Sequence, residues 1–362
     1  MASTTTPATN VNATNAKDGK HQYSRQSPFN RSWQRFRRNR RGYISLWIFS
    51  ILFFLSIFAE FLSNDKPLVV SYNNGIYFPV FKTYSETFFG GDFDTEADYN
   101  DPYMRELLSR GSNWAIYPLN PYYYDSINYY TRAPNPAAPS KDNLLGTDDH
   151  GRDVLARLIY GFRLSVLFAL SLTIIGTTLG VLAGAIQGYF GGRLDLFSQR
   201  LLEVWASMPE LYLLIIFASI FEPSILMLVI LLSLFGWMGL ADYVRAEFLR
   251  GRNMVYVTSA RALGVSNRAI MFRHLLPNSM TPVVTFLPFR VSGAILALTS
   301  LDFLGLGVPP PTPSLGDLLA QGKDNISAWW LSLTTFGVLV GTLVLLIFIG
   351  EALREAWDPR RE

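Results

Sequence analysis

The segment "TSARALGVSNRAIMFRHLLPN", from Thr258 to Asn278, is polar and basic although long apolar runs flank it on both sides. Its first part, "ARALG", favours a short helix that Gly264 ends, and Ser266 is suited to cap a second helix running towards Pro277. Two short helices joined at a glycine predict a projection that can insert into a groove on another protein, with Gly264 allowing close approach. The alternative is a basic surface loop without such a partner.

The flanking apolar runs decide the class of protein. The chain has 362 residues, 49% apolar and 16% charged, and the apolar ones cluster in stretches such as "ISLWIFSILFFLSIFAEFL", from Ile44 to Leu62. Such stretches approach the roughly 20 residues with which a helix crosses a bilayer. The sequence therefore predicts an all-α polytopic membrane protein. Its six expected spans are 44–62, 163–186, 202–221, 224–241, 281–303 and 329–350, with a turn at Glu222 and Pro223 between the third and fourth.

Basic residues beside the spans predict the orientation of the chain. The segment "RSWQRFRRNRRG" precedes the first span, and arginines also lie near the membrane in "QGYFGGRLDLFSQR" and "REAWDPRRE". Because Lys and Arg gather on the cytoplasmic side, both termini are expected there. The expected divisions are a disordered tail at 1–32, an entry segment and first helix at 33–62, an external insert at 63–147, a membrane core at 148–350 with a cytoplasmic loop at 242–279, and a C-terminal tail at 351–362.

The external insert is expected to have a small fold of its own. The runs "PLVVSY" and "IYFPVF" favour β-strands, and Asn74 and Gly75 between them suit a hairpin turn that needs positive φ. Two interpretations stay open. The insert can be a local cap over the ends of the spans, or it can be a docking surface for a soluble partner.

Several kinds of chemistry are absent from the sequence. There is no cysteine, which excludes disulfides and thiolate sites, and the three histidines form no H-E-x-x-H motif. Gly322 and Lys323 are adjacent, but Asp317 and Asp324 stand where a P-loop needs Gly and Ser or Thr. The excess of three basic residues is too small to indicate nucleic acid. We therefore expect no catalytic residues, no ATPase site and no nucleic-acid partner.

A cluster of possible metal ligands occurs in "GTDDHGRD", which contains Asp148, Asp149, His150 and Asp153. The following "VLARLIYGF" places its apolar residues on one helical face, which is typical of a helix lying in the membrane interface. We weigh that interpretation above a metal site and assign no metal ligands.

Two further features lie inside the expected spans. Gly176, Gly180, Gly184 and Gly188 recur at every fourth residue, and such a small-residue face favours close helix packing over a direct role in binding ligand. Arg290, in "LPFRVSG", falls close to mid-bilayer. It can pair with a partner subunit, or it can line a pathway and attract a substrate carboxylate.

With these residues in view, the chain resembles the inner-membrane permeases of ABC importers, in the dipeptide and oligopeptide family. Their cytoplasmic signature is Glu-Ala-Ala, three residues, Gly, and nine residues to an apolar-x-Leu-Pro ending. Here Thr258, Ser259 and Ala260 align with the triplet, Gly264 with the glycine, and Leu276 and Pro277 with the ending. The Glu and the first Ala are missing, and His274 replaces an apolar residue.

Three other segments carry the same resemblance. They are "LGTDDHGRDVLARLIYGFRLSV", "GYFGGRLDLFSQRLLEVWASMP" and "LDFLGLGVPPPTPSLGDLLAQG". The insert and "NDKPLVVSY" beside it look most like the Yej-type branch, which imports oligopeptides and the peptide-nucleotide antibiotic microcin C.

The resemblance implies the type I ABC importer permease fold in the bacterial inner membrane. It implies as partners a second homologous permease, two ATPase domains or subunits that bind ATP and Mg, and an extracytoplasmic peptide-binding protein, with no cofactor in this chain. A coupling helix at about Tyr256 to Gly264 would sit in a cleft of the ATPase. The residues so assigned to coupling are Tyr256, Val257, Thr258, Ser259, Ala260, Gly264, Val265 and Ser266, with Arg290 as the candidate of the substrate pathway.

The competing class is an autonomous secondary transporter or channel. Such a protein is expected to show inverted repeats and ionisable groups for ion coupling within its spans. The sequence shows no clear repeat and few intramembrane carboxylates. A membrane scaffold would leave the coupling motif unexplained.

Overall fold

The computed structural model describes residues 28–131 and 133–357, and its helices account for most of them. Five helical segments in this part of the chain are long and apolar enough to cross a membrane, and a bent pair brings the number to six. The prediction of an all-α polytopic membrane protein with six spans is confirmed in this form. The spanning elements are α2 (Arg40–Ile57), α5 (Val154–Phe190), α6 (Gly192–Ala206) with α7 (Glu210–Ile220), α8 (Ile225–Gly236) with α9 (Met238–Gly251), α12 (Leu276–Phe303) and α14 (Trp329–Trp357).

Several of these helices are longer than the expected spans. α5 has 37 residues and begins at Val154 rather than at 163. At 1.5 Å per residue it is about 55 Å long, well beyond a hydrocarbon core of about 30 Å. The "VLARLIYGF" segment is therefore the start of α5, and the expectation of a separate interfacial helix is wrong. In the same way α9 continues to Gly251, into the part expected as loop from 242.

The ends of the chain also differ from the expected tails. Helix α1 (Pro28–Arg38) covers residues 28–32, which were expected to be disordered, and α14 continues to Trp357 through most of the expected C-terminal tail. The rest of both tails, 1–27 and 358–362, lies outside the described residues. Helix α2 ends at Ile57, and the short α3 (Ala59–Leu62) follows after Phe58. Apolar composition locates a span in the membrane, but helical hydrogen bonding continues beyond it.

The glycine face of α5 packs on α9, as predicted. A Cβ added at Gly180 would lie 2.8 Å from the carbonyl oxygen of Trp237, and one at Gly188 would lie 2.5 Å from that of Arg245. At Gly184 the added atom would collide with the carbonyl oxygen of Ala241. Only glycine permits this approach of two backbones, so the face serves helix packing.

The insert folds as a small unit with a three-stranded antiparallel sheet. Its strands are β1 (Val69–Tyr72), β2 (Gly75–Tyr77) and β3 (Trp114–Ile116), in the order β2-β1-β3, and α4 (Pro102–Ser109) packs against them. The predicted hairpin is confirmed, but the positive φ angles belong to Asn73 and Asn74, one residue earlier than expected. β3 was missed because its three residues give too short a pattern to recognise.

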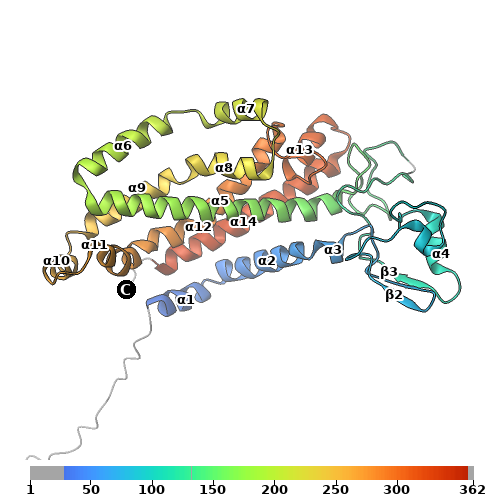
Figure 1. Ribbon diagram of the computed structural model, residues 1–362, viewed down its shortest axis with the longest axis horizontal. Helices are drawn as coiled ribbons and strands as arrows, with labels where there is room; N and C mark the ends of the chain where they lie inside the picture. The colour runs from blue at the N-terminus through green and yellow to red at the C-terminus, as the bar shows by residue number, and fades with distance from the viewer. Residues whose placement is uncertain (1–27, 132, 358–362) are drawn as a thin grey trace, which may run out of the picture.

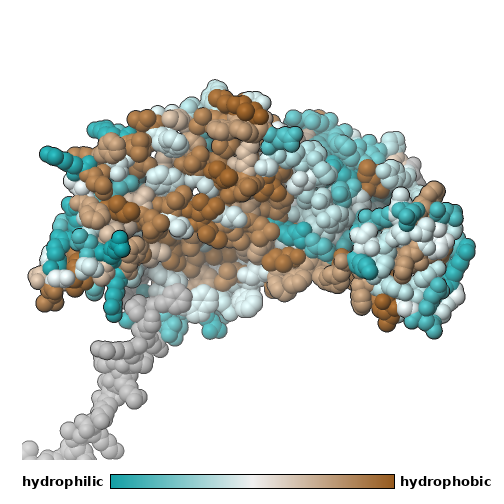
Figure 2. All heavy atoms as spheres, in the orientation of Figure 1, coloured by the Kyte–Doolittle hydropathy of each residue, from teal (hydrophilic) through white to brown (hydrophobic). Residues whose placement is uncertain are grey.

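The helices lie roughly side by side, with polar structures at both ends (Figure 1). The insert and α13 (Leu315–Asp324) lie at one end, and α10 (Val255–Ala262), α11 (Asn267–Ala269) and the C-terminal end of α14 lie at the other. Figure 2 shows a hydrophobic band over the helices between these two hydrophilic ends. A bilayer around that band leaves α10 and the insert on opposite sides of the membrane.

Candidate transport sites

The loop around Gly264 is built by a helix end and a helix start. α10 ends in a Schellman motif: Gly264 N–H donates to the Arg261 carbonyl (3.0 Å) and Val265 N–H to the Ala260 carbonyl (3.1 Å), with Gly264 at φ +78°. The hydroxyl of Ser266 then accepts from Ala269 N–H (3.4 Å), which begins the next helix as predicted. No atom lies within 4 Å of a Cβ placed on Gly264, so the glycine serves the turn and not a close approach within this chain.

The second helix does not stop near Pro277. α11 passes through a π-helical turn (Ile270–Leu275) into α12 without interruption. A π-helical turn shifts the hydrogen-bonding register, so that a residue without an N–H can follow it. The loop is thereby attached directly to the spanning helix α12.

The two faces of α10 differ sharply. Val257 and Ala260 are buried in a cluster with Val244 and Phe248 of α9 and Ile270 of the π-helical turn. On the outer face Val255 and Leu263 are 79% and 84% exposed. Two apolar side chains held out in this way provide a surface suited to a hydrophobic groove.

The predicted coupling residues divide accordingly. Val257 and Ala260 are buried against this chain, Val265 is half-buried, and the other five are exposed: Tyr256, Thr258, Ser259, Gly264 and Ser266. Sequence reasoning missed Val255 and Leu263. The available signal was their apolar character at the start of α10 and just after its end.

Arg290 lies on α12 among interruptions of the neighbouring helices. Its Nη2 donates to the carbonyl oxygen of Gly236 (2.8 Å), at the junction of α8 and α9, while its Nε is buried without a partner among the described residues. The indole N–H of Trp205, at the end of α6, donates to the Leu234 carbonyl two residues earlier (3.2 Å). The ends of α6 and α8 thus meet at the level of Arg290.

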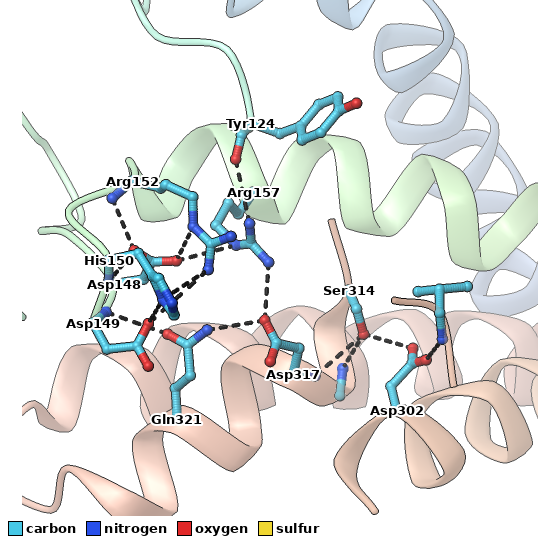
Figure 3. A network of polar contacts seen from close by, with 12 residues as sticks. Tyr124, Asp148, Asp149, His150, Arg152, Arg157, Asp302, Ser314, Asp317 and Gln321 are labelled. Atoms are coloured by element: carbon cyan, nitrogen blue, oxygen red, sulfur yellow. Dashed lines mark hydrogen bonds and ion pairs between the residues drawn. The ribbon is translucent and has the colours of Figure 1, made fainter. Parts of the chain in front are cut away.

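A buried ion-pair network lies beside the insert, at the end of the molecule away from α10 (Figure 3). Arg157 of α5 is 0% exposed; its Nη2 lies 2.9 Å from Oδ2 of Asp317 in α13, and its Nε lies 3.5 Å from Oδ2 of Asp148. Asp148 also accepts from Arg152 Nε (2.7 Å), and Asp317 accepts from the amide of Gln321 (2.9 Å). The network joins α5, α13 and the loop before α5.

The possible metal cluster is part of this network. Asp148, Asp149 and His150 lie close enough together to share an ion. Asp148, however, is fully buried and already accepts from Arg152 and from two backbone N–H groups, those of His150 and Arg152. These donors neutralise the carboxylate, so the cluster is accounted for by ion pairing. Asp153 lies apart in function, because it caps α5 through Ala156 N–H (2.8 Å).

Hydrogen bonds to a buried carboxylate hold the loop between α12 and α13. The buried carboxylate of Asp302 accepts from Ser314 Oγ (2.6 Å) and from Val308 N–H (2.9 Å). A Cβ on Gly316 would come within 2.5 Å of the Asp302 side chain, so glycine is needed for this approach. The motif "LDFLGLGVPPPTPSLGD" thus forms a self-bonded loop.

The insert and α3 line a half-open pocket of about 850 Å³. Its lining carboxylates outnumber its cations, Lys66 and Arg105, and are joined by tyrosines such as Tyr122. Burial raises the pKa of the Asp65 carboxyl, which also accepts from Ser126 Oγ (2.7 Å). Both earlier interpretations of the insert, a cap and a docking surface, are compatible with this acidic wall.

The sequence of this chain matches known protein families and relatives. A family model described as "Binding-protein-dependent transport system inner membrane component" matches residues 159–362, and one for the "N-terminal TM domain of oligopeptide transport permease C" matches residues 27–79. The chain is 52% identical to the Escherichia coli inner membrane ABC transporter permease protein YejE over 339 residues, covering 93% of this chain and 99% of that one. It is 50% identical to the Agrobacterium fabrum peptidoglycan transport system permease protein YejE, covering 91% and 93%.

More distant relatives match a smaller part of the chain. The dipeptide transport system permease protein DppC of Haemophilus influenzae is 37% identical over 218 residues, which cover 60% of this chain and 74% of that protein. The family matches and the full-length similarity to the YejE proteins confirm the resemblance seen in the motifs. The chain belongs to the binding-protein-dependent inner-membrane permeases of ABC transporters, in their dipeptide and oligopeptide family.

Proposed function

We propose that this chain is one of two permease subunits of an oligopeptide importer in the bacterial inner membrane. The relatives include permease proteins named for peptidoglycan, dipeptide and oligopeptide transport systems, which supports a peptide as substrate. A peptide-nucleotide antibiotic such as microcin C is a further candidate. The chain itself hydrolyses nothing; partner ATPase subunits bind ATP and Mg, and both termini of the chain lie in the cytoplasm.

The observation that carries this proposal is the outer face of α10. Val255 and Leu263 are held out from the membrane core by a rigid helix end, while Val257 and Ala260 anchor the same helix to α9 and the π-helical turn. An ATPase groove would cover the outer face, and the inner face would carry its movement to α9 and α12. The two arrangements of the ATPases would then bias two arrangements of the helices.

The substrate would pass along the face shared with the second permease. Arg290 is the candidate for a carboxylate contact, because its bond to Gly236 leaves other guanidinium N–H groups available on a partly exposed side chain. An external binding protein would deliver the peptide from the side of the insert.

The test is ATP hydrolysis by the purified complex in lipid, with and without loaded binding protein. Gly264→Asp places a side chain at φ +78° in the proposed groove and is expected to remove stimulation, or to release the ATPase subunits. Gly111→Asp is the matched control: Gly111 has φ +66°, no atom within 4 Å of an added Cβ, and a place in the insert. If Gly264→Asp keeps both assembly and stimulation, α10 does not couple the permease to an ATPase.

The rival function, autonomous secondary transport, gives a different result. Such a carrier would move peptide in proteoliposomes that contain this chain without any ATPase, driven by an ion gradient. We expect no uptake there until the second permease, the ATPases and ATP are supplied.

A further inference from the structure

The break between α6 and α7 places a carboxylate within a membrane span. The two helices qualify as a span only together and are bent by 65° at Ser207–Pro209. Glu210 begins α7 directly after Pro209. Its side chain is exposed, and none of the hydrogen bonds or ion pairs within the described part of the chain involves it. The nearby Glu203 differs, because Arg200 pairs with it at 2.6 Å.

A carboxylate without a partner is costly against lipid, so it must face water or another polar group. The side chains around it on α7 are apolar and exposed: Leu211 is 51% exposed and Tyr212 is 68% exposed. This chain therefore offers no counter-ion on that face among the described residues. The counter-ion has to come from outside the chain.

Packing contacts place Glu210 near the depth of Arg290. Leu214, one turn after Glu210, is buried in a cluster with Leu228 of α8 and Leu298 of α12. Trp205, five residues before Glu210, donates to the Leu234 carbonyl, and Arg290 donates to the Gly236 carbonyl two residues further along α8. Glu210 therefore follows within five residues of the level of Arg290.

Two helix interruptions and a proline within a helix lie in this zone. They are the bend after α6 and the junction of α8 and α9 at Gly236–Trp237, and a proline inside α12, Pro288, lies two residues before Arg290. The hydrogen bonds of Trp205 to Leu234 and of Arg290 to Gly236 tie them to one another. Discontinuous spans with exposed charges are suited to binding a polar solute at membrane depth.

We propose that Glu210 receives the positively charged end of the substrate, the free α-ammonium group of a peptide, on the translocation path. This rests on the proposed function and adds to it a cation contact that complements the carboxylate contact of Arg290. A peptide at neutral pH carries both charges, and an extended residue spans about 3.3–3.6 Å, so a few residues bridge depths that differ by roughly one helical turn. A single carboxylate then favours peptides whose amino terminus is free.

The experiment compares uptake of two probes, tetra-alanine and N-acetyl-tetra-alanine, by the complete complex in proteoliposomes with one binding-protein preparation. Glu210→Gln is expected to slow tetra-alanine uptake about tenfold, as the loss of a charge-assisted hydrogen bond predicts, and to leave the acetylated peptide within about twofold. Each variant is divided by wild type for the same probe, so the preference of the binding protein cancels. Glu203→Gln is the control and is expected to change neither ratio, because Glu203 already has Arg200 as its partner.

Three results would overturn the inference. If Glu210→Gln slows both probes equally, the residue has no preference for the ammonium group. If the variant separates the two permeases, Glu210 pairs with the partner subunit and not with substrate. If the wild-type complex imports neither probe, the proposed function fails together with the inference, and this outcome is distinct because it does not involve the variant.

Discussion

The two ends of the molecule differ in how the side chains discussed above are partnered. At the end with the insert, Arg157 pairs with both Asp148 and Asp317, and Asp302 accepts hydrogen bonds from its own loop. At the other end, α10 leaves Leu263 and Val255 open to solvent. Two long helical segments connect these ends: α5 has 37 residues, and α11, the π-helical turn and α12 together have 37.

The difference indicates where the chain needs another protein. Buried ion pairs fix one geometry, because each missing partner would leave an uncompensated charge. The exposed apolar side chains of α10 leave no charge unpaired within the chain. Their burial becomes favourable only when a partner covers them. The ion-pair network beside the insert is therefore complete within this chain, whereas the outer face of α10 is the surface that we propose a partner covers.

The largest effect is expected from breaking the ion-pair network of Arg157 beside the insert. Arg157→Gln leaves Asp317 without its cation and Asp148 with only Arg152, so the variant should lose about 3 kcal/mol or more of unfolding free energy. The midpoint of unfolding of the purified permease, followed by tryptophan fluorescence, measures this. Arg200→Gln is the control, because its pair with Glu203 is exposed and worth less than about 1 kcal/mol. Equal shifts for both variants would show that burial adds nothing to the network.

A smaller loss is expected in the packing that connects the two ends. Gly184→Val forces its side chain against the Ala241 carbonyl and should cost about 2 kcal/mol through overpacking. The same unfolding midpoint records it. Gly341→Val in α14 is matched to it, since no atom lies within 4 Å of an added Cβ there. If the two substitutions are equally tolerated, α5 and α9 separate without cost and do not act as a rigid pair.

Changing the open end should alter coupling and leave stability unchanged. Leu263→Asp puts a charge on the outer face of α10, which should reduce ATP hydrolysis stimulated by the binding protein about tenfold, the equivalent of about 1.4 kcal/mol. Ile326→Asp is the control, because Ile326 is similarly exposed (86%) but follows α13, at the end of the molecule that holds the insert and not at α10. A fall in the unfolding midpoint of Leu263→Asp would mean that α10 has an internal structural role after all.

The smallest effect concerns pH and the insert. Burial raises the pKa of Asp65 above its ordinary value of 3.8, so the folded state holds the proton more tightly than the unfolded chain. The contribution of this group to stability is therefore greatest below pH 3.8 and declines as the pH rises through the folded-state pKa. Asp65→Asn should flatten this part of the pH dependence of the unfolding midpoint, because the variant has no carboxyl group to titrate at this position. A steeper decline in the Asp65→Asn variant would reverse the sign of the argument.

The sequence by itself determined the class of protein, the approximate spans and the loop at Gly264. Each depends on local properties: apolar runs of membrane length, a glycine that takes positive φ, and a serine that caps a helix. The glycine face of α5 was also readable, because a spacing of four residues follows one side of a helix. These features hold whatever the rest of the chain does.

Only the tertiary structure decided which side chains meet. It placed Arg157 and Asp317 together although 160 positions separate them, set Arg290 on the carbonyl of Gly236, and left Glu210 without a partner among the described residues. It also divided α10 into an anchored face and an open face. The physical reason is that pairing and burial depend on contacts between distant segments, which packing selects and local propensity does not encode.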